Sequence, residues 1–255
     1  MADRAPLAEL AARLGVDRFA TEPAALAARL ARCRALVFDW DGVLGPGAKG
    51  PAAAGGFHEV DAMGLNLLRY GLWRRGGSGA VPPVAVVSGQ HDPGARALAE
   101  RDRLTALYMG FLDKRVALEH LCRTLGVEPR EVLFVFDDVI DLGAAEQCGA
   151  RFLVSRAGQP LLEDFARRQG LCDYVVHAPA GAGAVREACE VALALLGIYE
   201  EVFQARGWLD ESYRRYLEAR AKLAPTRRFR AERDGAAGAE RVAEEPAPPP
   251  EQPRT

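Results

Sequence analysis

Residues 35–45 read ALVFDWDGVLG, and this stretch decides the fold. Its opening residues, ALVF at 35–38, are apolar and predict a short buried strand. The run stops on two acidic residues, Asp39 and Asp41, with one residue between them, and Gly42 follows at once. A strand that carries two carboxylates out of the core side by side predicts that a functional site lies at its end.

Further short β-rich runs follow along the chain, with amphipathic stretches between them. The runs cover residues 81–89, 106–110, 131–138, 150–155 and 173–179. The helical patterns cover about 61–75, 92–103, 113–125, 141–148, 159–169 and 183–205. Near-continuous apolar strands that alternate with such helices are typical of a parallel sheet covered on both faces. We therefore predict a doubly wound parallel α/β domain over residues 33–197.

The segments outside this domain are predicted to be helical or disordered. Residues 1–32 read as an N-terminal extension of two short helices, and residues 198–223 as a C-terminal helical extension. Within the latter, 207–223 repeats large apolar residues on one helical face, which packing against the domain explains better than a partner site. Residues 224–255 combine charge, proline and small residues, and this composition predicts a disordered tail.

Composition excludes several classes of function. The chain has 255 residues, 49% of them hydrophobic, and a net charge of −2, which gives no field to attract nucleic acid or an anionic membrane surface. No apolar run is long enough to span a membrane, and the N-terminus lacks the pattern of a signal peptide. The five cysteines form no CxxC pair, so we expect reduced core thiols and a cytoplasmic protein.

Polar and charged residues fall where four of the predicted strands end. They are Asp39 and Asp41; Ser88; Lys114; and Asp137, Asp138 and Asp141. The carboxyl ends of parallel strands share one edge, so we expect these residues to lie together. Crowded carboxylates repel each other, and a hard divalent cation with oxygen ligands neutralises them. Mg²⁺ fits best, with one carboxylate free to act as nucleophile and its neighbour to move protons.

Lys114 and Ser88 suggest that the ligand is an anion. Lys114 follows a plausible N-cap, Asp113, so its charge lies in the first turn of a helix, where the helix dipole disfavours a cation by about 0.3–1 kcal/mol. A nearby anion would reverse that cost. Ser88 ends a strand, and Gly89 beside it would let backbone N–H groups approach a ligand.

Four motifs in order resemble those of the haloacid-dehalogenase-like (HAD) phosphatase superfamily. They are VFDWDGVL, VVSG, the DK pair at 113–114, and FDDVIDL at 136–142. FHEVDAMGLNLLRYG (57–71) and AGAGAVREACE (180–190) are similar to segments of its capless branch, typified by 3-deoxy-D-manno-octulosonate 8-phosphate phosphatase. The resemblance covers residues 33–197 and implies a Rossmann-like core. The spacing between motifs leaves no room for a large cap domain.

The resemblance also assigns roles to these residues. Asp39 would be the nucleophile that forms an aspartyl-phosphate, and Asp41 would protonate the leaving alcohol and then activate water. Mg²⁺ would lie between Asp39, the backbone carbonyl of Asp41 and Asp137. Asp138 would lie close by and Asp141 would brace the site. Ser88, Gly89 and Lys114 would bind the phosphoryl oxygens.

The sequence departs from the family at three places. Phe136 stands before Asp137 where the family usually has glycine, which would put a large ring against the metal-bearing loop. Gln90 stands where the branch often has arginine. GPGAKGPAAAGG (45–56) replaces a β-hairpin that, in the family, helps build a tetramer, and it reads as a flexible loop.

We therefore predict an Mg²⁺-dependent phosphomonoesterase that acts on a small sugar or sugar-acid phosphate, with no nucleic-acid or membrane partner. A homo-oligomer is left open by the sequence. The alternative from another class is a catalytically silent HAD-like domain that acts as an assembly or regulatory module, and Phe136 favours it. Taken singly, the motifs also have plainer interpretations: a strand-ending turn for Asp39 and Asp41, a capped helix start for the later acids, and a surface lysine for Lys114.

Overall fold

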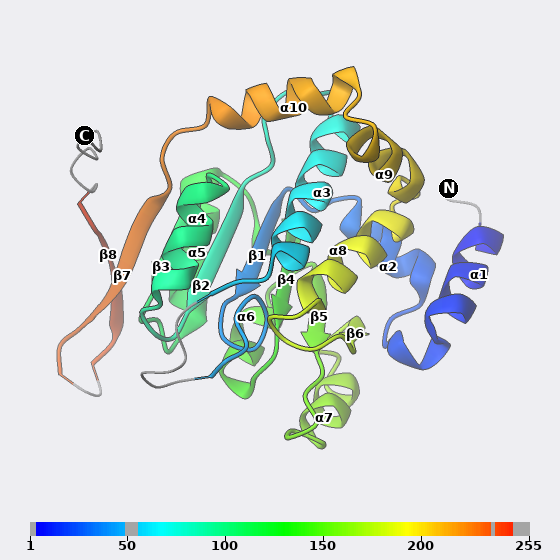
Figure 1. The fold of residues 1–255 in the computed structure, drawn as a ribbon. Helices are drawn as coiled ribbons and strands as arrows, with labels where there is room; N and C mark the ends of the chain where they lie inside the picture. The colour runs from blue at the N-terminus through cyan, green and yellow to red at the C-terminus, as the bar shows by residue number, and fades with distance from the viewer. Residues whose placement is uncertain (1–3, 49–55, 236–237, 247–255) are drawn as a thin grey trace.

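The strand at residues 35–39 lies in the middle of a sheet in the computed structural model, which describes residues 4–48, 56–235 and 238–246 (Figure 1). Among these residues, eight strands form the sheet in the order β6-β5-β4-β1-β2-β3-β7-β8. All neighbours are parallel except β7 and β8, which pair antiparallel. The strands are β1 (Ala35–Asp39), β2 (Val84–Ser88), β3 (Ala106–Met109), β4 (Val132–Phe136), β5 (Ala150–Val154), β6 (Tyr174–Val176), β7 (Arg227–Arg233) and β8 (Glu240–Glu244).

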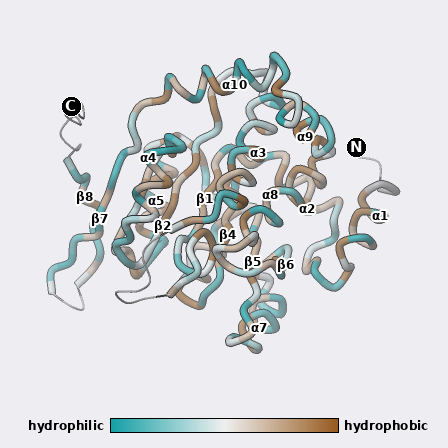
Figure 2. Tube along the Cα trace, viewed as in Figure 1, coloured by the Kyte–Doolittle hydropathy of each residue, from teal (hydrophilic) through white to brown (hydrophobic). Residues whose placement is uncertain are grey.

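Helices cover both faces of the sheet, as predicted for a doubly wound fold. The α-helices are α1 (Arg4–Leu14), α2 (Pro23–Leu30), α3 (Glu59–Arg75), α4 (Pro93–Arg101), α5 (Lys114–Leu125), α6 (Leu142–Ala145), α7 (Leu162–Arg168), α8 (Ala184–Leu195), α9 (Tyr199–Gly207) and α10 (Glu211–Ala221). Alternate residues of each strand point to opposite faces. In β1, Leu36 and Phe38 belong to the core with α3, α4 and α8, whereas Ala35 and Val37 belong to the core with α5, α6 and α7. Figure 2 shows the hydrophobic colours concentrated along the central strands.

The two segments that resemble the capless branch, 57–71 and 180–190, contact each other in the fold. Asp61, in the first turn of α3, is fully buried and accepts hydrogen bonds from the backbone N–H groups of Gly183 and Arg186 at 3.0 Å each. A carboxylate at this place satisfies N–H groups at the start of α8 that have no partner within the helix. Gly64 lets the two helices approach, because a Cβ there would lie 2.7 Å from the Cα of Arg186.

The C-terminal part of the chain corrects two predictions. The helix expected over 183–205 is two helices, α8 and α9, separated at Gly197, whose φ of 70° interrupts the helix. The tail expected to be disordered over 224–255 instead contains β7 and β8, and residues 247–255 lie outside the described residues. Phe229 of β7 stacks on Tyr108 of β3 with ring centroids 4.7 Å apart. That contact and the pairing with β3 extend the sheet at its edge.

Helix α10 packs by the tyrosines of the predicted apolar face, but Trp208 and Leu209, which were to begin that face, precede the helix and are exposed. Tyr213 and Tyr216 are buried, and both hydroxyl groups hydrogen-bond to Asn66 of α3. Trp208, just before the helix, is 79% exposed. In Figure 1 this helix lies at the end of the sheet opposite the carboxyl ends of the parallel strands, so it does not cover the site described next.

Two further predictions concern loops. The segment 45–56, predicted to be a flexible loop, lies largely outside the described residues, which resume at Gly56. Its first residue, Gly45, forms a β-bridge with Asp41. The Phe136 ring is buried and stacks on Phe134 at 5.4 Å. It lies in the core that also contains Ala144 and Ala145 of α6, the helix that follows the metal-bearing loop. That the ring presses on the loop stays a prediction.

Candidate active site

Three buried carboxylates meet at the carboxyl edge of the sheet. Asp39 is the last residue of β1, Asp137 follows β4 directly, and Asp141 ends the short 3₁₀ turn Val139–Asp141. Each offers a carboxylate oxygen, and these oxygens lie within 4.8 Å of one another. The fold thus brings together residues that are about a hundred positions apart in the sequence.

Lys114 provides the positive charge at the centre of this cluster. It is the first residue of α5, and its side chain is 1% exposed. Its Nζ lies 2.6 Å from Oδ1 of Asp39 and also forms an ion pair with Asp141. A buried ammonium group is stable here because two carboxylates accept its hydrogen bonds. The alternative interpretation of Lys114 as a surface lysine is therefore wrong.

The cluster shifts the protonation equilibria of its members. Burial raises the pKa of Asp39 well above its ordinary value, the Asp141 carboxylate adds to this, and Lys114 opposes it. Burial also raises the pKa of Asp137, to about 6. For Lys114, burial acts to lower the pKa, but the two carboxylates outweigh it and raise that pKa. Burial and crowding of like charges therefore disfavour the ionised carboxylates, and a cation bound at the site would relieve both effects.

The donor set fits a hard divalent cation. Oδ1 of Asp137 is buried and has no hydrogen-bond partner among the described residues. Such an atom is costly to bury unless something else neutralises it. The cluster offers only oxygen ligands, which Mg²⁺ prefers, and it lies where a phosphate ester could complete the coordination. The residues present therefore fit a magnesium ion.

Two of the predicted residues form a second contact beside the cluster. The Ser88 hydroxyl, at the end of β2, donates to Oδ2 of Asp41 at 3.4 Å and accepts from the backbone N–H of Gln90 at 3.1 Å. Ser88 is buried and Asp41 is half-buried. Gly89 follows Ser88, where a Cβ would meet only ordinary contacts, the nearest being the Phe111 carbonyl at 3.7 Å.

The acidic residues after β4 form different hydrogen bonds. Asp141 Oδ2 accepts from the backbone N–H groups of Asp137 and Asp138, at 3.4 and 3.1 Å, and so holds the loop in shape. The Asp138 carboxylate accepts from Val139 N at 2.6 Å and does not belong to the group of clustered oxygens. Asp141, predicted as a supporting residue, therefore lies closer to the candidate metal position than Asp138 does.

One residue of the site was missed by the sequence analysis. Arg156, which follows β5, donates from Nη1 to Oδ2 of Asp137 at 2.6 Å, and its side chain is 35% exposed. The signal available was its place just beyond the predicted strand 150–155, at the same edge as the other site residues. No sequence motif linked it to Asp137.

Gly42 is needed for this geometry. Its φ is 86°, and a Cβ would lie 1.9 Å from Oδ2 of Asp137. We expect Gly42→Ala to destabilise the protein by about 1–3 kcal/mol and to weaken stabilisation by Mg²⁺, since Asp137 must move. Thermal unfolding with Mg²⁺ and with EDTA measures both effects. Gly158→Ala is the control, because nothing lies within 4 Å of a Cβ there; equal losses in both variants would contradict the steric explanation.

Comparisons with known proteins identify relatives of this chain. No family model matches the chain. The 3-deoxy-D-manno-octulosonate 8-phosphate phosphatase KdsC of Salmonella typhi is 32% identical over 173 residues, which are 66% of this chain and 83% of that protein. The solved phosphatase of that name from Yersinia pestis is 29% identical, with a TM-score of 0.56 over 69% of this chain and 89% of that one.

A third relative was solved with a bound metal. The deoxy-D-mannose-octulosonate 8-phosphate phosphatase of Haemophilus influenzae was solved in a cobalt-bound form; it is 25% identical, with a TM-score of 0.57 over 71% of this chain and 99% of that chain. The parallel sheet and its carboxylate cluster define a HAD-type phosphatase, a phosphoric monoester hydrolase. Within that class, the chain belongs to the family of 3-deoxy-D-manno-octulosonate 8-phosphate phosphatases. None of the described helices has the length and apolar character needed to cross a bilayer.

Proposed function

We propose that this protein hydrolyses a sugar or sugar-acid phosphate through an aspartyl-phosphate on Asp39, with Mg²⁺ as cofactor. The observation that carries the proposal is the cluster of three buried carboxylates around Lys114. A structural role alone does not explain such a cluster, because replacing buried charges by apolar groups is often neutral or stabilising. The cytoplasmic location stays a prediction.

Asp39 is oriented for nucleophilic attack. Its Oδ1 accepts from the backbone N–H of Trp40 at 2.7 Å and pairs with Lys114, so we assign the attack on phosphorus to Oδ2. A bond forms between Oδ2 and phosphorus as the bond from phosphorus to the leaving oxygen breaks. Lys114 and the Ser88 hydroxyl would then bind the phosphoryl oxygens and stabilise their charge.

Asp41 is positioned to move the proton. We propose that it donates a proton to the leaving alcohol and later removes one from the water that hydrolyses the aspartyl-phosphate. Its contact with Ser88 ties the acid to the phosphoryl-binding side of the site. Asp39, Asp137 and the backbone carbonyl of Asp41 would hold Mg²⁺, with Asp138 and Asp141 supporting them. When bound, the ion would offset the charge of the carboxylates and of the phosphate.

The substrate class follows from the relatives, which are named for a sugar-acid phosphate. Gln90 stands where the branch often has arginine, so the contact to the acid group of such a substrate would come from another residue here. Homo-oligomerisation stays a proposal. The relatives are named phosphatases, which speaks against the silent-module alternative, and Phe136, the residue that favoured it, packs in the core.

The test is phosphate release from sugar phosphates, sugar-acid phosphates and an aryl phosphate, each with Mg²⁺ and with EDTA. We expect release that requires Mg²⁺, and the order of rates among the substrates identifies the preferred leaving group. Mg²⁺ should also raise the melting temperature, because it binds only the folded site. No release from any substrate, together with no thermal shift, would contradict the proposal and favour a non-catalytic module.

A further inference from the structure

The loop at residues 110–113 joins β3 to Lys114, so its conformation decides where the Lys114 side chain begins. It belongs to no helix or strand, and Gly110 adopts a left-handed φ of 82°. Phe111 N donates to the Ser88 carbonyl of β2 at 3.0 Å, which ties the start of the loop to the sheet. The N–H groups of Leu112 and Asp113 need acceptors from elsewhere.

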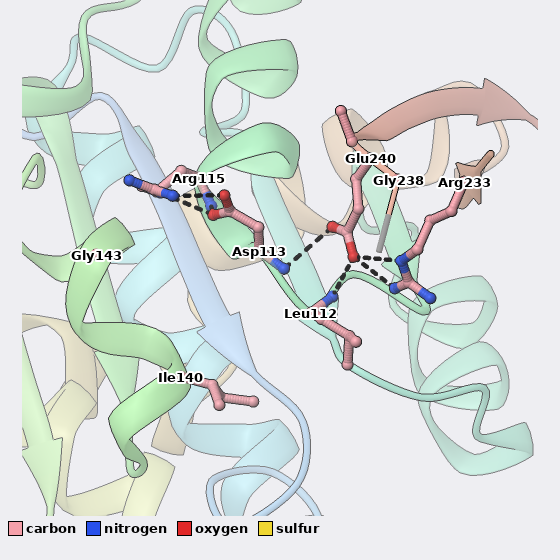
Figure 3. A pocket seen from close by; sticks show the side chains of 9 residues that line it. Leu112, Asp113, Arg115, Ile140, Gly143, Arg233, Gly238 and Glu240 are labelled. Carbon is pink, nitrogen blue, oxygen red and sulfur yellow. Dashed lines mark hydrogen bonds and ion pairs between the residues drawn. The ribbon is translucent and has the colours of Figure 1, made fainter. Parts of the chain in front are cut away.

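The C-terminal hairpin supplies these acceptors. Glu240, the first residue of β8, accepts from Leu112 N at 2.9 Å and from Asp113 N at 3.1 Å, one bond to each carboxylate oxygen. Arg233, the last residue of β7, donates from Nε to Glu240 at 2.7 Å and from Nη2 to the Gly110 carbonyl. Figure 3 shows the Glu240 carboxylate between the loop and Arg233.

These hydrogen bonds join the hairpin to the loop beside an open pocket of about 520 Å³. Leu112 of the loop and Gly238 and Ala239 of the hairpin are among its lining residues. The Glu240 side chain is nevertheless only 6% exposed. A nearly buried carboxylate with two backbone N–H donors and an arginine partner is a strong and directional anchor.

We propose that Glu240, held by Arg233, is a positioning residue for catalysis. It fixes the 110–113 loop so that Lys114 reaches the phosphoryl group. The inference rests on the proposed function, which makes Lys114 a phosphoryl-binding residue. The hairpin follows residues 33–197, over which the sequence resembles the family, and the Yersinia pestis structure matches 69% of this chain. Residues predicted to be a disordered tail thus become part of the active-site support.

The test uses Glu240→Gln, which keeps the size of the side chain. Its amide nitrogen would face one of the two backbone donors, and the ion pair with Arg233 would be lost. Glu244→Gln is the matched control: Glu244 lies on the same strand and pairs with Arg227 at 2.8 Å, but it is half exposed. We measure kcat and KM with Mg²⁺, melting temperature, and amide hydrogen exchange in the peptide that contains residues 110–114.

We expect Glu240→Gln to lower kcat by about tenfold with a smaller change in KM, because a displaced Lys114 acts mainly on the transition state. Exchange at Leu112 and Asp113 should become faster, and Glu244→Gln should change neither. A Glu240→Gln enzyme with unchanged kcat would overturn the inference, whether or not its melting temperature falls. A wild type without Mg²⁺-dependent activity would instead overturn the proposed function, and the role of Glu240 with it.

Discussion

Asp39→Asn is expected to reduce Mg²⁺-dependent phosphate release by about 10⁴-fold or more, since it removes the attacking oxygen. The amide nitrogen of asparagine cannot form the aspartyl-phosphate. The amide oxygen can still accept from Trp40 N, as Oδ1 of Asp39 does at 2.7 Å, so the local backbone should be kept. Initial rates of phosphate release from the best substrate, with circular dichroism to verify folding, give the comparison.

Stability separates loss of chemistry from loss of fold in this variant. Burial and the Asp141 carboxylate raise the pKa of Asp39, so the charged form is disfavoured in the folded state. Lys114 keeps Asp141 as a partner in this variant, so in EDTA at neutral pH we expect Asp39→Asn to lose less stability than a variant that removes the Lys114 ammonium group. Asp164→Asn is the control, because Asp164 is an exposed partner of Arg168 on α7. Full turnover by the Asp39→Asn protein would rule out the aspartyl-phosphate mechanism.

The central strands and the carboxylate cluster could be predicted because their signals are local. Each apolar run is one strand, and the topology of a parallel sheet places the ends of those strands at one edge. Asp39, Asp137 and Asp141 therefore follow from position alone, once the strands are assigned. Sequence position alone did not predict which of the later acids joins the cluster. Asp138 caps a turn, whereas the Asp141 carboxylate lies in the cluster.

The C-terminal hairpin could not be predicted, because it is stabilised by ion pairs and by contacts with residues far away in the sequence. Arg227 pairs with Glu244 across the two strands, and Phe229 stacks on Tyr108, more than a hundred residues earlier. A segment rich in charged and small residues is predicted to be disordered if its charged side chains are assumed to be solvated. Here the charges pair with one another, and a parallel edge strand, β3, supplies the backbone partners. Arg156 was missed for the same reason, as its partner Asp137 is near only in the fold.

Lys114→Met is expected to have the largest effect on stability. Its Nζ is buried between Asp39 and Asp141, so removing the ammonium group leaves two carboxylates without their cation. Breaking a buried ion pair from one side costs about 3–5 kcal/mol, and we expect that loss in EDTA by chemical denaturation. Phosphate release should fall at least about 100-fold, since a donor to the phosphoryl oxygens is lost.

Two further variants test whether electrostatics cause this loss. Lys222→Met, at the exposed C-terminal end of α10, removes a lysine where no buried acid depends on it, and it should change the free energy of unfolding by less than about 0.5 kcal/mol.

In the double variant Lys114→Met/Asp141→Asn, one negative charge is removed together with the positive one. The amide of the introduced asparagine would keep an oxygen for the N–H group of Asp138, so the loop retains its brace. The double variant should then be more stable than Lys114→Met alone, and Mg²⁺ should stabilise it less, because fewer carboxylates remain to attract the ion. If both variants unfold at the same denaturant concentration, uncompensated charge is not what Lys114 relieves, and its packing would have to account for the loss.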